Sequence, residues 1–368
     1  MTSPVYFTDL RASYTNSLVR KLETLADRAG IGDCLDKRDL AAVKLHFGEL
    51  GNTAFVRPVF IRAIVDRIKA AGARPFLTDA NTLYAGSRSD APSHLDTAIR
   101  NGFAYAVVGA PLVIADGLRG KSETPVAIAG NRFETVYIGT EIVEADALIS
   151  VAHFKGHELS GFGGTLKNLG MGCASRKGKL AQHSTVSPKV KRKRCIGCGE
   201  CADHCAPGAI RVVDEKAVVD PDACIGCGEC IIVCPQGAVQ IQWDQAIPVF
   251  LENMVEYTKG VLTNKAGKTL FVNFITDISP ACDCVPYNDA PVVRDIGLVA
   301  STDPVAIDQA SVDLVNGEPG LPGSCLTENI GPGEDKFKGL YPKVDWEHQL
   351  DYAERLGLGS RQYELVTI

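Results

Sequence analysis

The chain has 368 residues, more than the roughly 250 to 300 at which a single hydrophobic core stops growing, so we expect one large domain with a small companion. Its content of 45% hydrophobic and 22% charged residues is ordinary for a globular protein, and the net charge of −6 argues against nucleic acid as the main partner. No run approaches the roughly 18 to 20 apolar residues of a transmembrane helix, and the first residues lack a signal-peptide pattern, so we expect a cytoplasmic protein without a membrane span.

Helical and strand-like patterns alternate from the first residues onward. Apolar residues recur at helical spacing over residues 17–29, 58–71, 93–101, 246–258 and 304–315, with a short helix near Glu141. Short apolar runs typical of buried strands occupy residues 5–7, 40–47, 74–78, 106–115, 135–138, 147–154, 269–275 and 296–300. The alternation predicts an α/β fold with a largely parallel sheet and helices on both faces.

A cysteine-rich stretch interrupts this alternation, and the same α/β pattern resumes after it. We therefore predict one α/β domain in two parts, residues 1–189 and 244–368. Residues 190–243 would be a small α+β domain inserted between the two parts.

The inserted stretch contains one cysteine pattern twice. It reads CIGCGECADHC and later CIGCGECIIVC, and it holds eight of the thirteen cysteines. In each copy three cysteines follow at three-residue steps, and a fourth lies four residues further on. This spacing is typical of two [4Fe–4S] clusters, because two intervening residues let a tight loop place three sulfurs on one cube. The glycines would let the backbone approach the sulfides.

The fourth cysteine of each copy is expected to bind the cluster of the other copy. One cluster is therefore assigned to Cys195, Cys198, Cys201 and Cys234. The other cluster is assigned to Cys224, Cys227, Cys230 and Cys205. With this crossed ligation the two repeats are interlocked, and neither should fold alone.

Residues 190–243 resemble a bacterial-type two-cluster ferredoxin domain. One departure is that Cys205 is followed by Ala206 and Pro207, whereas Cys234 is followed directly by Pro235, as is usual. We expect a slightly altered loop rather than a lost ligand. Two other readings remain open: zinc would favour two C-x-x-C pairs with a long gap between them, and disulfides would need an oxidising compartment.

Polar residues gather at the ends of three predicted strands in the α/β domain. They are Lys44, His46, Asp79, His153, Lys155 and His157. In open parallel sheets, ligand sites lie outside the carboxyl ends of the strands, so these residues predict a shared crevice. Any one of the histidines taken alone is more often a structural residue.

A glycine-rich run, GHELSGFGGTLKNLGMGCASRKGK, follows the last of these strands at residues 156–179. Its glycines and Lys167 could present backbone N–H groups and an ammonium to a small anionic ligand at the start of a helix. The spacing matches neither a Walker A loop nor a Rossmann fingerprint. A tight turn beside the inserted domain explains the glycines equally well.

Cys282 and Cys284 form a C-x-C pair after another predicted strand. Such a pair can offer two thiolates to an additional metal ion, with Cys173 as a third ligand and His153, His157 or His183 as a fourth. We favour the alternative of reduced cysteines without a cofactor, because the sequence fixes no distance between Cys173 and the pair.

Several segments outside the cysteine repeat resemble the domain-of-unknown-function family 362, whose members are often fused to ferredoxin modules. They are VKLHFGELGN at 43–52, TDANTLY at 78–84, HFKGHELSGFGGTLKNLGMGC at 153–173, CDC at 282–284 and DIGLVASTDPVAIDQASVDL at 295–314. The resemblance covers most of the chain. It implies no established reaction, so it gives the crevice residues no catalytic role.

Three functions are compatible with these features. The first hypothesis is an electron-transfer protein that passes low-potential electrons to or from a dedicated redox partner protein. The second is a redox enzyme, an oxidoreductase whose clusters act on a small molecule in the crevice, with Lys167 among the crevice residues. The third is a redox sensor or binding module with structural clusters. We place the electron-transfer protein first.

Overall fold

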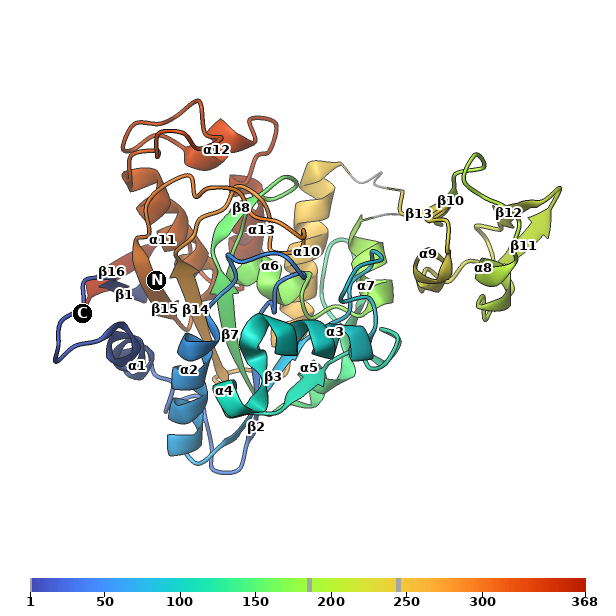
Figure 1. Cartoon of the computed structure of the whole chain (residues 1–368). Helices are drawn as coiled ribbons and strands as arrows, with labels where there is room; N and C mark the ends of the chain where they lie inside the picture. Colours follow the sequence, from blue (N-terminus) through green and yellow to red (C-terminus); the bar gives the residue numbers. More distant parts are fainter. Residues whose placement is uncertain (1, 184–186, 243–245) are drawn as a thin grey trace.

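The computed structural model describes residues 2–183, 187–242 and 246–368. Its centre is an eight-stranded sheet in the order β16-β1-β15-β14-β7-β2-β3-β4 (Figure 1). The strands are β1 (Ser3–Asp9), β2 (Leu40–Lys44), β3 (Arg74–Asp79), β4 (Leu112–Ile114), β7 (Ala147–His153), β14 (Thr269–Ile275), β15 (Gly297–Ser301) and β16 (Tyr363–Thr367). All neighbouring pairs are parallel except those that β15 makes with β1 and β14. The predicted, largely parallel α/β sheet is confirmed.

Helices cover both faces of this sheet. Side chains alternate between the two faces along each strand, and both faces are apolar. In β7, Ala147, Ile149 and Val151 enter one core, and Leu148 enters the other. The first core packs against α1 (Leu18–Arg28), α2 (Pro58–Ala70), α3 (Ala91–Ala98), the wider turn η1 (Ile99–Phe103) and α4 (Tyr105–Val108). The second core packs against α5 (Thr140–Glu144), α6 (Thr165–Gly170), α10 (Ile247–Leu262), α11 (Pro304–Gly317), α12 (Lys336–Leu340) and α13 (Glu347–Arg355).

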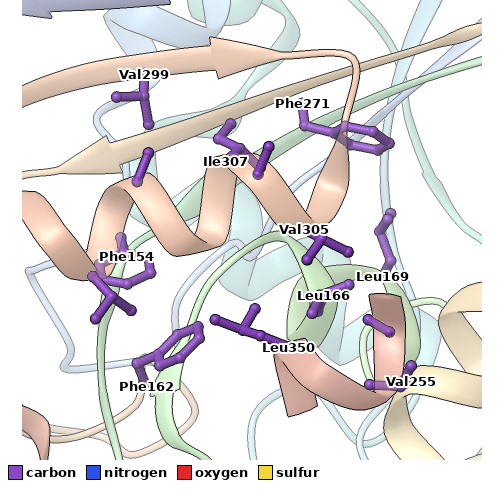
Figure 2. Close-up of a cluster of buried hydrophobic side chains, with 14 of the residues drawn as sticks. Phe154, Phe162, Leu166, Leu169, Val255, Phe271, Val299, Val305, Ile307 and Leu350 are labelled. Atoms are coloured by element: carbon purple, nitrogen blue, oxygen red, sulfur yellow. The ribbon is translucent and has the colours of Figure 1, made fainter. Parts of the chain in front are cut away.

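The second core anchors the glycine-rich run to the sheet. Figure 2 shows Leu166 of α6 among apolar side chains that include Ile307 of α11 and Leu350 of α13. Strands β8 (Lys155–His157) and β9 (Gly161–Gly163) form a hairpin that follows β7. The rings of Phe154, just before β8, and Phe162, in β9, lie 5.1 Å apart between centroids. The packing holds α6 rigidly beside the carboxyl ends of the strands.

Several element boundaries differ from the sequence-based prediction. The strand predicted over 40–47 ends at Lys44, where the backbone leaves the sheet, and the apolar segment 106–115 divides into α4 and β4. A hairpin of β5 (Glu123–Ala127) and β6 (Thr135–Gly139) precedes α5, and α7 (Arg176–His183) follows α6. Within the described residues, no helix combines the length and apolarity needed to cross a bilayer.

Residues 189–242, the cysteine unit, extend from the side of the α/β body near α7 and α10 (Figure 1). The elements of this unit are β10 (Lys189–Val190), α8 (Glu200–Asp203), β11 (Ile210–Val213), β12 (Lys216–Val219), α9 (Glu229–Val233) and β13 (Val239–Gln240). Strands β10 and β13 pair, so the two ends of the unit lie side by side. The last main-sheet strand before the unit, β7, and the first one after it, β14, are neighbours in the main sheet. The predicted boundary at residue 243 lies outside the described residues.

Candidate functional site

The eight cysteines of the cysteine unit line two separate hollows. One hollow is lined by Cys195, Cys198, Cys201 and Cys234. The other hollow is lined by Cys205, Cys224, Cys227 and Cys230. Each set combines three cysteines of one repeat with the last cysteine of the other. They are the same two sets of four cysteines that the cysteine spacing assigned to two clusters. Binding of [4Fe–4S] clusters by these sets stays a prediction.

Glycines shape the loops around both hollows in the same way. Gly197 and Gly199 of the first repeat have φ values of 68° and 87°, and their counterparts Gly226 and Gly228 have 69° and 71°. These left-handed conformations are costly for residues with a side chain. The C-x-x-C-x-x-C loops therefore adopt one backbone form twice, with the backbone close to the sulfurs.

Backbone N–H groups point at sulfur atoms in the first set. The amide of Ala217 donates to Cys195 Sγ at 3.3 Å, and the amide of Ala238 donates to Cys234 Sγ at 3.2 Å. The hydrogen bond from Ala217 holds the pKa of Cys195 below its usual range. Such bonds stabilise thiolate, the form of cysteine that binds metals.

The sulfurs within each set lie close enough to influence one another. Burial raises the pKa of Cys201, and the negative charges of Cys234, Cys195 and Cys198 raise it further. In the second set, burial and then Cys227, Cys224, Cys201 and Cys205 raise the pKa of Cys230 to about 12. Because ionising one sulfur of a set disfavours ionising its neighbours, a positively charged group would stabilise the set as thiolates.

The described residues include all thirteen cysteines, and none of these is in a disulfide. Among the same residues, no three His, Cys, Asp or Glu side chains converge closely enough to hold one metal ion.

The cysteine unit meets the α/β body through a buried carboxylate. Glu229, between Cys227 and Cys230 in sequence, lies 3.0 Å from Arg176 Nη1, 3.3 Å from Arg119 Nη1 and 3.4 Å from Lys121 Nζ. Both Glu229 and Arg176 are almost fully buried. Three cations of the body therefore hold the second repeat of the unit.

Apolar contacts reinforce this interface. Leu83 and Leu180 of the body belong to the same apolar cluster as Cys201 and Cys230. A Cβ atom placed on Gly228 would lie only 3.0 Å from Leu83 Cδ1, so the loop of the second set approaches the body closely. Leu83 also lines the central cavity of the body. The second set and the cavity therefore share one residue of the wall between them.

This cavity has a volume of about 600 Å³ and opens beyond the carboxyl ends of β2, β3, β7 and β14. Most of the predicted crevice residues line it, together with the C-x-C pair. The lining includes Lys44, His46, Asp79, Lys155, His157, Lys167, Cys282 and Cys284. His153 and Cys173 are not part of the lining.

An ion-pair network forms the cavity wall at β2 and β3. Lys44 Nζ lies 3.0 Å from Asp79 Oδ1 and donates to Asn168 Oδ1 at 2.9 Å. Arg88 joins Asp79 to Glu49, at 3.4 and 3.1 Å. Burial alone would raise the pKa of Asp79, but Lys44 and the other cations hold it well below its usual range. The carboxylate of Asp79 is thus ionised, and it orients Lys44 rather than accepting a proton.

His46 and His157 are neutral histidines of the cavity lining. His46 Nδ1 accepts from the amide of Gly48 at 3.0 Å, and His157 Nδ1 accepts from the amides of Leu159 and Ser160 at 3.2 and 3.1 Å. Burial holds the pKa of both rings well below the usual range. Each ring therefore carries its proton on Nε2 and is a hydrogen-bond donor there.

His153 and Lys155 hold the C-x-C segment from behind. Asp283, the residue between the two cysteines, is fully buried and lies 2.8 Å from His153 Nδ1 and 3.3 Å from Lys155 Nζ. His153 Nε2 also contacts the carbonyl of Thr276 at 2.8 Å. His153 thus positions the loop after β14 instead of facing the cavity.

The surroundings of Cys282 favour the thiolate form of its side chain. Lys167 Nζ donates to Cys282 Sγ at 3.2 Å. A hydrogen bond from the Cys284 thiol, together with the charges of Lys167 and Lys155, holds the pKa of Cys282 well below its usual range in spite of burial. Cys173 instead lies in the hydrophobic core, where burial raises its pKa to about 11. Cys173 therefore lies in the core, outside the cavity lining that holds the C-x-C pair, where the less favoured alternative had offered it as a third ligand.

The backbone N–H groups at the start of α6 are already used. The carboxylate of Asp308 on α11 accepts from the amides of Thr165 and Leu166 at 2.7 and 2.9 Å. The predicted capture of an anion by this helix start is therefore replaced by an internal carboxylate. Lys167 still lines the cavity, as do Asn168 and Met171 of the same run.

Sequence reasoning missed several residues of the cavity wall. Glu49 and Arg88 lie in the loops after β2 and β3, so a search that included these whole loops would have found them. Lys179 lies on α7, where burial lowers its pKa to about 8, and it donates to the carbonyl of Ala174 at 2.5 Å. His183, which the sequence had offered as a possible fourth ligand beside the C-x-C pair, also lines the cavity and stacks on Phe250, with ring centroids 4.8 Å apart.

Among solved structures, the lactate racemase apoprotein from Thermoanaerobacterium thermosaccharolyticum is similar, with 15% identity and a TM-score of 0.39. The match covers 74% of this chain, which spans about half (51%) of that protein. A crystal structure of a protein from Thermotoga maritima matches with 8% identity and a TM-score of 0.40, over 94% of this chain and 60% of that one. No curated protein matches the chain.

The sequence of the α/β body matches a family model over most of its length. The model is described as Domain of unknown function (DUF362), and it aligns with residues 41–313. That range includes the strand ends around the cavity, the whole cysteine unit and the C-x-C pair. The chain therefore belongs to the DUF362 family.

Proposed function

We propose that this protein is an iron–sulfur electron-transfer protein that binds two [4Fe–4S] clusters and exchanges low-potential electrons with a redox partner protein. One cluster would be held by Cys195, Cys198, Cys201 and Cys234. The other would be held by Cys205, Cys224, Cys227 and Cys230. When bound, such clusters accept and release single electrons.

The observation that carries the proposal is the crossed grouping of the cysteines around two hollows. Cysteines from repeats about 30 residues apart would have no reason to mix if each repeat bound its own metal ion. The amide donors to Cys195 and Cys234 and the left-handed glycines support the same ligand sets. The protein residues supply thiolates, N–H donors and an apolar surrounding, the three means by which a protein sets a cluster potential.

The test is metal analysis of the anaerobically purified protein, followed by reductive titration with electron paramagnetic resonance. We expect about eight irons and eight sulfides per chain and two interacting spins on reduction. Four irons would contradict the assignment of one set. Stoichiometric zinc without iron would contradict both.

A second function, that of a redox enzyme acting on a small molecule in the cavity, is favoured by one further observation. Leu83 lines the cavity and also packs in the apolar cluster of the cysteine unit. A carrier that only serves another protein needs no cavity of about 600 Å³ beside one of its cysteine sets. The ammonium of Lys179 in the wall suits a substrate with an anionic group.

Reoxidation of the reduced protein separates the two functions. If the enzyme proposal holds, reoxidation accelerates with a small molecule that fills the cavity, and the effect weakens when Lys179 is replaced by Met. Reoxidation that depends only on a partner protein identifies a carrier. Clusters that cannot be reduced without loss of the fold would contradict both proposals and indicate a structural role.

A further inference from the structure

The C-x-C segment is built as a fixed turn that presents both sulfurs to the cavity. Its turn is closed by the amide of Val285, which donates to the carbonyl of Cys282 at 3.2 Å. The carbonyl of Asp283 accepts from the amide of Glu49, and the carbonyl of Cys284 accepts from the hydroxyl of Tyr84 at 2.8 Å. Asp283 itself is buried away from the cavity, whereas both cysteines line it.

The two sulfurs are chemically unequal. The charged groups that face Cys282 are Lys167, Lys155 and Asp283, and the Cys284 thiol donates a hydrogen bond to the Cys282 sulfur. The hydrogen bond to Cys282, burial and the nearby Cys282 charge raise the pKa of Cys284 well above its usual range, so Cys284 carries the proton. One thiolate and one neighbouring thiol in the same cavity wall form a nucleophile with a resolving partner.

We propose that Cys282 and Cys284 are a redox-active dithiol that reduces small disulfides in the cavity. Cys282 is the attacking thiolate, Cys284 is the resolving thiol, and Lys167 is a positioning residue that stabilises the Cys282 thiolate. The inference rests on the proposed function for one element only, the supply of electrons by two one-electron iron–sulfur centres.

The reaction balances as a two-electron exchange. Cys282 Sγ attacks the disulfide R–S–S–R, forming a Cys282–S–S–R bond and releasing one RS⁻, which takes the proton of Cys284. The Cys284 thiolate then attacks Cys282 Sγ, the bond to R–S breaks, and the second RS⁻ takes a proton from solvent. Restoring one thiolate and one thiol from the Cys282–Cys284 disulfide requires two electrons and one proton. Two one-electron carriers supply that number of electrons.

The test treats the anaerobically purified protein with 2-hydroxyethyl disulfide and analyses the tryptic peptide 269–294, which contains no other cysteine. In the wild type we expect this peptide to lose the mass of two hydrogen atoms, because an internal disulfide closes. The Cys284→Ser variant should instead retain the hydroxyethylthio group on Cys282. The Cys282→Ser variant should react at Cys284 more than about tenfold more slowly, since Cys284 is protonated.

Two matched controls address folding and general reactivity. Cys325 is exposed and does not line the cavity, so its labelling reports general thiol reactivity in every sample, and Cys325→Ser should leave closure of the pair unchanged. Lys167→Gln should slow the modification of Cys282, and Lys167→Arg, which keeps the charge, should restore it. Labelling of Cys325 without closure of the pair, or equal rates at Cys282 and Cys284 in the single variants, would overturn the proposal.

Iron and sulfide measured on the same samples separate this inference from the cluster assignment. After removal of the probe, reopening of the disulfide by dithionite should be at least about tenfold faster in the iron-loaded protein than in a Cys201→Ser, Cys230→Ser variant. If the disulfide forms but reopens at equal rates in both proteins, the dithiol proposal stands and the clusters are not its source of electrons. Iron-loaded protein with an inert pair would retain the clusters and reject the dithiol.

Discussion

The α/β body and the cysteine unit bury their interiors in different ways. The body has an apolar core on each face of its sheet, with helices packed over both. The cysteine unit has one small core, which includes Cys195, Cys201 and Cys230 and takes Leu83 and Leu180 from the body. A unit of this size buries little apolar surface and is marginally stable by itself. The body is thus held by its own packed residues, whereas we expect the unit to depend also on the groups that we propose its cysteines bind.

Removing iron under anaerobic conditions should therefore have the largest effect on folding, and it should affect the cysteine unit but not the α/β body. A strong iron chelator should unfold residues 189–242 and leave the sheet of the body intact. Without a cation, the ionised sulfurs within each set of four cysteines would repel one another. Hydrogen exchange followed by mass spectrometry measures both regions at once. Retained protection in β11 and β12 after complete iron loss would show that the unit folds on its own.

A large-to-small change in the body should have the converse effect. Phe154 is fully buried between Phe162 and Phe337, so Phe154→Ala should lower the free energy of unfolding of the body by about 3–5 kcal/mol. Urea denaturation measures the loss, and the iron content of the folded protein should not change. Tyr14→Ala, at a fully exposed aromatic residue, is the matched control and should cost less than about 0.5 kcal/mol.

The repeated C-G-E-C motif offers a matched pair of substitutions at the junction of the two regions. Glu229→Gln leaves the buried Arg176 without its carboxylate and should cost about 3 kcal/mol, near the lower limit for breaking a buried ion pair. Glu200, its counterpart, is exposed and lies 3.8 Å from His204, so Glu200→Gln should be nearly neutral. Thermal unfolding of both variants tests the contrast. Equal losses would show that the three-cation contact does not hold the unit.

Lys179 predicts a smaller, pH-dependent effect within the body. Burial lowers its pKa from 10.5 to about 8, so the folded state binds fewer protons than the unfolded state between these values. The stability of the wild type should thus gain on the order of 2 kcal/mol as the pH rises from 8 to 10.5, and the gain should be absent in Lys179→Met. Urea titrations at both pH values measure this difference. An equal gain in stability in Lys179→Met would show that other titrating groups cause it.

Much of the body was predictable, because its periodic patterns report burial directly. The helices at 58–71 and 304–315 have proline in the first turn and match α2 and α11 closely. The reversed direction of β15 was not predictable, since alternation shows which faces of a strand are buried but not which way it runs. Strand β16 was missed because its residues are half exposed at the edge of the sheet.

The candidate site was predictable in part for a similar reason. The rule that ligands bind beyond strand ends located Lys44, Asp79 and Lys155. It could not show that Arg88 reaches the same network from a loop, or that His153 turns behind the wall to bind Asp283. Those positions depend on tertiary contacts between segments far apart in the sequence. The interface carboxylate Glu229 looked identical to Glu200 in the repeat, and only the fold distinguishes them.

Anomalous diffraction at the iron edge from crystals of the anaerobically purified protein tests the central claim most directly. The account predicts two iron clusters, one among Cys195, Cys198, Cys201 and Cys234 and one among Cys205, Cys224, Cys227 and Cys230. A cluster bound by the four cysteines of a single repeat would contradict the crossed ligation. Density for a single metal ion in place of a cluster would contradict the iron–sulfur assignment itself.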